Sequence, residues 1–160
     1  MDRVIDTNIA VIANGREVTA SVSCQIKAIE FLEAAVSRDR TVIDAGNRVL
    51  GEYRKRLKAE GQPGVGDQFF RHLLDNQGNT KRIRVIDERD ARGDPLRRAF
   101  AHGNLSAFDP SDRPFAICSA VGRARVVTAT DSDWLIHEVG LQACGVRVEF
   151  ICGKAAATKA

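Results

Sequence analysis

Apolar residues recur along this chain at helical and at strand-like spacings, and the two spacings predict most of its secondary structure. Between residues 22 and 36, apolar side chains follow one another at three- and four-residue steps, which is typical of an amphipathic helix. Stripes of the same kind predict further helices at about 49–57, 69–74, 115–121 and 132–143.

Short apolar segments alternate with these helices and predict strands. The first contains Val4 and Ile5, and the later ones are "TVIDAG", a strand or an extended link, then "RIRVID", "RVVTAT" and "VRVEFI". Residues 88–110 are polar and contain glycine and proline, which predicts a long connection with one helical turn near "PLRRAF". The final "KAAATKA" offers little to bury, so we expect it to be frayed.

The alternation of strands and helices predicts the fold class. Strands joined by helices form right-handed crossovers, so we expect an α/β fold with three α/β/α layers and a central, mainly parallel sheet. The 160 residues, of which 44% are hydrophobic, suffice for the core of one domain, and no linker or repeat divides residues 1–160. In such sheets, ligands bind beyond the carboxyl ends of the strands.

Acidic residues stand where such a ligand site is expected. Asp6 directly follows the first strand, and Asp131 directly follows "RVVTAT", with Asp133 two residues later. If both strands are central and parallel, Asp6 and Asp131 converge on one edge of the sheet. Glu52 lies at the margin of the apolar stripe of its helix, and Asp112 lies at the start of a helix, so both are expected to face the same edge.

Each acid also has a purely structural interpretation. Asp6 is suited to cap a turn or a helix start, and Asp112 is a favourable charge at a helix start. Asp131 and Asp133 are suited to cap the last helix, and Glu52 to form an ion pair with Arg56 one turn later. Together, however, several carboxylates in a partly buried cleft repel one another and need a cation in order to ionise together. Oxygen ligands without soft partners favour Mg²⁺ or Mn²⁺, which promote phosphodiester hydrolysis. The acids therefore indicate metal-dependent phosphodiester chemistry.

Four segments resemble the PIN-domain family of small metal-dependent ribonucleases, which includes many bacterial toxins. They are "VIDTN" at the start, "VLGEYRKRL" around Glu52, "FDPSDRPFAICSAV" around Asp112, and "VVTATDSDW" around Asp131 and Asp133. The resemblance covers nearly the whole chain. It implies a catalytic metal site formed by Asp6, Glu52, Asp112 and Asp131, with Asp133 as an additional ligand or a supporting group. It also implies Mg²⁺ or Mn²⁺ as the cofactor and RNA as the substrate.

Polar residues beside these acids are candidates for orienting them. The resemblance implies that Thr7 or Asn8 hydrogen-bonds a ligand or a water, as groups around a metal site commonly do. A common form of the family has threonine two residues before the last acid. Ala129 stands there in this chain, with Thr128 and Thr130 on either side, so either hydroxyl is a candidate to support Asp131.

The segment before Asp112 contains a second acid that competes with it. Asp109 precedes a proline, which favours a turn residue over a metal ligand. Ser111 is then the expected cap of the following helix, and Pro114 falls in its tolerant first turn. We therefore prefer Asp112 as the ligand.

The overall charge identifies no partner by itself, but the distribution of basic residues does suggest one. A net charge of +3 is small, and clusters of basic residues are most often solvated surface. Such clusters become relevant beside a site that handles phosphates. We accordingly predict that the RNA backbone is bound by Arg54, Arg56, Arg97 and Arg98.

Cysteine and histidine usage indicates no further chemistry. No C-x-x-C pair is present, and the predicted state of all four cysteines is a reduced core thiol: Cys24, Cys118, Cys144 and Cys152. The three histidines are scattered and are interpreted as surface or packing residues. The chain has neither a secretion signal nor an apolar run of about 20 residues, so we expect a cytoplasmic protein without a membrane partner.

Two classes of function are compatible with these patterns. The first is a Mg²⁺- or Mn²⁺-dependent endoribonuclease. Such an enzyme is compatible with two kinds of protein partner: an antitoxin-like inhibitor, and a second copy of the chain in a homo-oligomer. The alternative is a non-catalytic RNA- or protein-binding module that retains the fold, and the retained acids argue against it. A phosphatase with an aspartyl nucleophile would need D-x-D-x-T after the first strand, which "DTN" does not supply.

Overall fold

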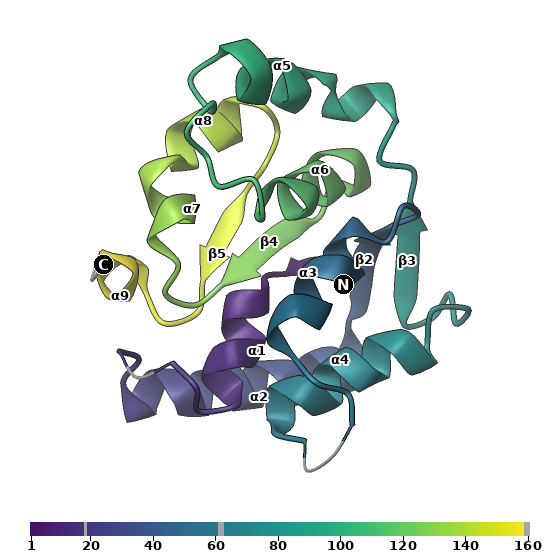
Figure 1. Ribbon diagram of the computed structural model, residues 1–160, viewed down its shortest axis with the longest axis vertical. Coiled ribbons are helices and arrows are strands. Elements are labelled where there is room, and N and C mark those ends of the chain that lie inside the picture. The colour runs from purple at the N-terminus through teal and green to yellow at the C-terminus, as the bar shows by residue number, and fades with distance from the viewer. Residues whose placement is uncertain (18, 61–62, 159–160) are drawn as a thin grey trace.

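A parallel sheet forms the centre of the computed structural model, which describes residues 1–17, 19–60 and 63–158 (Figure 1). Within these residues the sheet has five strands in the order β3-β2-β1-β4-β5, and every neighbouring pair runs parallel. The strands are β1 (Asp2–Ile5), β2 (Arg40–Asp44), β3 (Ile83–Ile86), β4 (Arg125–Thr128) and β5 (Val148–Phe150). The predicted α/β class and the parallel sheet are confirmed.

Helices cover both faces of the sheet and complete the α/β/α layers. Figure 1 shows α6 on one side of the sheet, with α1, α2 and α4 packed together on the other. The helices along the described chain are α1 (Thr7–Ala13), α2 (Val22–Arg38), α3 (Arg48–Arg56), α4 (Val65–Asp75), the short 3-10 helix η1 (Ala91–Gly93), α5 (Asp94–His102), α6 (Arg113–Gly122), α7 (Ser132–Ile136), α8 (Glu138–Ala143) and α9 (Lys154–Ala157).

The longest helix, α2, shows how the apolar pattern becomes structure. Ser21 caps its start, because its hydroxyl accepts a hydrogen bond from the backbone N–H of Cys24 at 3.0 Å. The buried residues Cys24, Ala28, Leu32 and Ala35 follow at helical steps and form the face that packs on the core.

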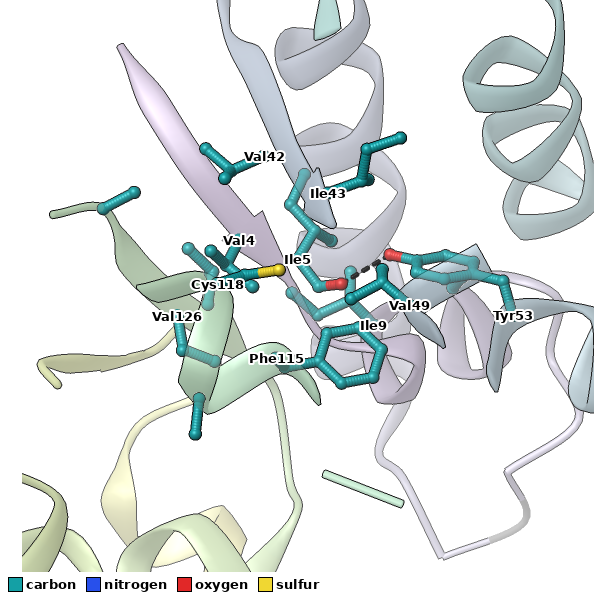
Figure 2. Packing of buried hydrophobic residues seen from close by; sticks show 14 of the residues in the cluster. Val4, Ile5, Ile9, Val42, Ile43, Val49, Tyr53, Phe115, Cys118 and Val126 are labelled. Atoms are coloured by element: carbon teal, nitrogen blue, oxygen red, sulfur yellow. Dashed lines mark hydrogen bonds between the residues drawn. The ribbon is translucent and has the colours of Figure 1, made fainter. Parts of the chain in front are cut away.

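The core contains buried residues of the sheet and of the helices on both of its faces, among them α1, α2, α4 and α6, and it includes an aromatic cluster around Tyr53 of α3. In Figure 2, the Tyr53 hydroxyl donates a hydrogen bond to the backbone carbonyl of Ile5, at 2.5 Å. The Tyr53 ring lies about 6 Å from the rings of Phe69, Phe70 and Phe115. This buried bond ties α3 to the carboxyl end of β1, the position from which the chain continues into Asp6.

Three segments are more ordered, or differently divided, than the sequence pattern predicts. The connection after β3 contains the nine-residue helix α5 instead of one helical turn. The helix expected at 132–143 is two helices, α7 and α8, separated at His137. The tail expected to fray forms α9, in which Ala157 is fully buried, so packing that the local sequence does not reveal holds it.

A disulfide contradicts the prediction that all cysteines are reduced. Cys24, at the start of α2, and Cys152, just after β5, are joined across a sequence separation of 128 residues. Cys118 and Cys144 are free, as expected. Apolar neighbours indicate burial of a cysteine, but they carry no information about which distant cysteine the fold brings beside it. None of the described helices has the length and apolar character needed to cross a membrane.

Removing the disulfide should destabilise the protein without changing its fold. A cross-link between residues 128 positions apart restricts the unfolded chain, and losing such a bond typically costs about 2–4 kcal/mol of unfolding free energy. We expect Cys152→Ser to lower the melting temperature, and reductant to lower that of the wild type to a similar value. Cys144→Ser is the matched control and should melt like the wild type without reductant. Insensitivity of the wild type to reductant would contradict the cross-link.

Candidate metal centre

The candidate site is built where two central strands end side by side. β1 and β4 pair with Ile5 opposite Val127, and the backbone N–H of Asp6 donates to the Val127 carbonyl at 2.9 Å. Asp6 and Asp131 therefore leave the sheet at the same edge, as predicted. Asp112 reaches this edge from the first turn of α6. One carboxylate oxygen from each of Asp6, Asp112 and Asp131 lies within 4.8 Å of the other two.

Asp6 is the most enclosed of these carboxylates, with 1% of its surface exposed. Its Oδ2 accepts hydrogen bonds from the Thr128 hydroxyl at 2.8 Å and from the Trp134 indole N–H at 3.2 Å. The Thr7 hydroxyl lies 3.5 Å from Oδ1. Burial, followed by the nearby Asp131 carboxylate, nevertheless raises the pKa of Asp6 to about 7.

Asp112 has the least support of the three. It is 6% exposed, and among the described residues no group donates a hydrogen bond to its carboxylate. Burial and then repulsion from Asp6 and Asp131 raise its pKa to about 9. Burial likewise raises the pKa of Asp131, whose Oδ1 accepts the backbone N–H of Asp133 at 2.9 Å.

The structural interpretation of these acids as helix caps holds for one of them. Asp131 caps α7 through its bond to Asp133. Asp6 and Asp112 also precede helices, but neither side chain makes a capping hydrogen bond, although the Asn8 backbone lies near enough to lower the pKa of Asp6. Asp112 is thus buried beside the other two carboxylates without a donor from the described chain, and the pKa of Asp6 stays raised in spite of its bonds to Thr128 and Trp134. A divalent cation fits this all-oxygen set, because it would allow the three to ionise together.

Glu52, predicted to be a fourth ligand, does not join this group. It lies on α3 one residue before Tyr53 and forms an ion pair with Lys55 at 2.8 Å. The expected pairing with Arg56 is replaced by this one. The structure therefore brings together three of the four predicted acids, and a role for Glu52 in metal binding stays a prediction.

Asp133 and Asp109 form a second acidic pair around the three carboxylates. Asp133 accepts the backbone N–H of Asp109 at 2.7 Å and lies 3.2 Å from Nδ1 of His137. The Asp109 side chain accepts the backbone N–H and the hydroxyl of Ser111, which confirms its interpretation as a turn residue. Ser111 is accordingly not the cap of α6, which begins after Asp112.

Two polar neighbours of the site, Thr128 and Asn8, act on different acids. Thr128 supports Asp6, not Asp131. Asn8 accepts the backbone N–H groups of Ala129 and Thr130, at 3.2 and 2.8 Å, and its amide donates to the Thr130 hydroxyl at 3.3 Å. Asn8 thereby fixes the turn that leads from β4 to Asp131, whereas its expected hydrogen bond to a ligand or a water stays a prediction.

Trp134 is the site residue that sequence reasoning missed. Its buried indole donates to Asp6 and packs edge-on against Phe108. A signal was present: this is the only tryptophan of the chain, placed directly after "DSD", where a buried ring on α7 points back toward the acids.

The predicted RNA-binding arginines differ in how free their guanidinium groups are. Arg56 is exposed and near enough to Asp131 to lower its pKa. Arg54 is exposed and borders a separate hollow over α3 and α4. Arg97 pairs with Asp94 and donates to the carbonyls of Glu88 and Asp90, so it stabilises the segment before α5. Arg98 is exposed and lies toward Cys144.

Comparison with known proteins supplies no relative: no protein-family model, curated protein or solved structure matches the chain. The function must therefore be argued from the geometry of the site and from the sequence segments given above. Membership of the PIN-domain ribonucleases, which those segments suggest, stays a prediction.

Replacing one acid should separate a metal centre from unrelated carboxylates. In chelator, Asp6→Asn removes a repelling charge while keeping an oxygen for Thr128, so we expect a higher melting temperature than that of the wild type. With excess Mn²⁺ the order should reverse, because a ligand at one hundred times its Kd stabilises the folded state by about 2.7 kcal/mol.

A buried acid outside the site provides the matched control. Asp67 accepts the backbone N–H groups of Lys58 and Gly64 and pairs with Arg16. Asp67→Asn should therefore lower the melting temperature by the same amount in chelator and in Mn²⁺. An Asp6→Asn variant that behaves in the same way would refute the metal centre.

The raised pKa values, about 7 for Asp6 and about 9 for Asp112, predict how stability depends on pH. Between the pKa of an unfolded aspartate, about 4, and these folded values, the metal-free folded chain binds more protons than the unfolded chain. The two protonated carboxyl groups thus contribute most to the free energy of unfolding below pH about 4, and this contribution is lost as pH rises through about 7 to 9. Thermal melts in chelator should show this loss, and Asp112→Asn should reduce it.

Proposed function

We propose that this protein is a metal-dependent endoribonuclease whose cation, Mg²⁺ or Mn²⁺, is held by Asp6, Asp112 and Asp131. The observation that supports the proposal is the convergence of these buried carboxylates within 4.8 Å at the carboxyl edge of the sheet. Hard oxygen ligands suit both ions, which keep several waters and are commonly held through a few acids and the phosphates of a substrate.

A cation at this position would activate water and polarise a phosphodiester. The chain itself supplies the positioning. Asp6 is fixed by Thr128 and Trp134, and Asp131 is fixed through the turn that Asn8 holds, so two of the three ligands are oriented before a cation arrives. Asp112, which lacks hydrogen-bond donors among the described residues, is the ligand that gains most from the cation.

Charge around the site supports a polyanionic substrate. Asp133 and Asp109 add negative charge on one side, whereas Arg56 provides positive charge beside Asp131. A phosphate oxygen is attracted by the cation and by Arg56, which together offset repulsion from the acids. The choice of RNA rests on the resemblance to PIN-domain ribonucleases, as does an antitoxin-like protein that would restrain the enzyme.

Incubation with total RNA tests the proposal directly. We expect cleavage in Mn²⁺, none in chelator, and a loss of more than about a hundredfold for Asp6→Asn or Asp112→Asn, since replacing even the groups that surround metal ligands costs 10–100-fold in typical enzymes. Asp75→Asn, which removes an exposed acid paired with Arg71, should cleave at the wild-type rate. Cleavage in chelator, or cleavage that survives both substitutions, would refute the mechanism and leave a non-catalytic binding module as the alternative.

A further inference from the structure

A second cavity lies beside the metal centre, over the carboxyl ends of β2 and β3. Its volume is about 510 Å³, within the range of sites for small molecules. Its lining is rich in arginine and includes Arg48, Arg113, Asp44, Glu88, Phe100 and Pro114. We propose that this cavity binds one nucleotide of the RNA substrate and prefers guanine as its base, an inference that rests on the proposed function.

The first turn of α6 forms a wall common to the cavity and the metal centre. Asp112 precedes the turn and faces the other two carboxylates, while Arg113 and Pro114, the next residues, line the cavity. Asp44 ends β2 and Asp6 follows β1, and these two strands are parallel neighbours in the sheet. A nucleotide in the cavity is therefore adjacent to a phosphodiester at the metal centre.

The two acids of the cavity differ in how many hydrogen bonds they already accept. Both oxygens of Asp44 are used, by the backbone N–H groups of Arg48 and Val49 at 2.9 Å each. Glu88 accepts one, from the Gly46 N–H to Oε2 at 3.2 Å, and its Oε1 has no donor among the described residues. Glu88 is also held closely against Gly46, where a Cβ would lie 2.2 Å from Oε1. It is a positioned carboxylate with acceptor capacity to spare.

Two arginines of the cavity provide complementary contacts. Arg48 is exposed, and no described residue forms an ion pair or hydrogen bond with its guanidinium, so it is free to bind a phosphate. Arg113 is fixed: it donates to the carbonyls of Ser106 and Phe108 at 3.0 and 3.2 Å, and it lies 5.0 Å from the centre of the Phe100 ring. A planar guanidinium held in this way offers a surface on which a base stacks.

Guanine fits these groups better than the other bases do. Its N1–H and its exocyclic amino group point in the same direction and can donate two parallel hydrogen bonds to one carboxylate, Glu88. Adenine and cytosine present one amino donor next to a ring acceptor. Uracil presents one N–H between two carbonyls, which a carboxylate repels. The expected order of affinity therefore begins with guanine and ends with uracil.

Binding of the four nucleoside 5′-monophosphates, measured by calorimetry in chelator, tests the cavity without the catalytic cation. We expect guanosine monophosphate to bind at least about tenfold more tightly than uridine monophosphate, because guanine donates two hydrogen bonds to the charged carboxylate and uracil at most one. Glu88→Gln should abolish this preference. Arg48→Ala should weaken the binding of all four nucleotides by about tenfold, whereas the matched control Arg71→Ala, an exposed arginine on α4 that does not line the cavity, should leave their binding unchanged.

Two results would overturn the proposal: no binding of any nucleotide by a protein with the wild-type melting temperature, or an unchanged preference in Glu88→Gln. Both are independent of RNA cleavage in Mn²⁺. Guanine-selective binding by a protein that does not cleave RNA would support the cavity and refute the ribonuclease. Cleavage without nucleotide binding in the cavity would support the ribonuclease alone.

Discussion

Parallel pairing of β1 with β4 is the interaction on which the site depends. The two strands are distant in sequence, and their register places Ile5 opposite Val127, so the residues that follow each strand lie at one edge. The ladder continues one bond further, from the Asp6 N–H to Val127, which fixes the backbone of the most buried acid. The Tyr53 hydroxyl donates a hydrogen bond to the carbonyl of Ile5 and so holds α3 at the same edge of the sheet (Figure 2).

The electrostatic character of the site is clearest beside the other buried acids. Asp44 and Asp67 are as buried as Asp6, but each accepts backbone N–H groups through its oxygens. Hydrogen bonds and Arg16 lower the pKa of Asp67 in spite of its burial. For Asp112 the balance is reversed, because burial and four acidic neighbours raise its pKa and no group of the described chain donates a hydrogen bond to it. The fold therefore lowers the pKa of Asp67 through hydrogen bonds and a nearby charge, whereas the pKa values of the three clustered acids are all raised.

The sequence predicted the site best where an acid directly follows a strand, because parallel pairing then places such acids at one edge of the sheet. Asp6 and Asp131 each follow an apolar strand directly, and that relation alone predicted their convergence. The position of Glu52 at the margin of a helical stripe indicated which way its side chain faces, but not how far it lies from the other acids. In the structure its partner is Lys55. Some contacts form only when side chains distant in sequence meet in the fold, such as Trp134 with Asp6 or Cys24 with Cys152. No repeating pattern in the sequence signals such contacts, and they were not predicted.

The disulfide divides the chain into a covalent ring and a free N-terminal arm. The ring runs from Cys24 to Cys152 and contains β2, β3, β4 and β5, together with Asp112 and Asp131. β1 and α1 lie outside it, although β1 occupies the middle of the sheet, between β2 and β4. Asp6 thus enters the metal centre only when the arm inserts between the two halves of the ring's sheet. A cation held by all three acids, as proposed, would bind only that inserted state, so its binding would be thermodynamically linked to closure of the sheet.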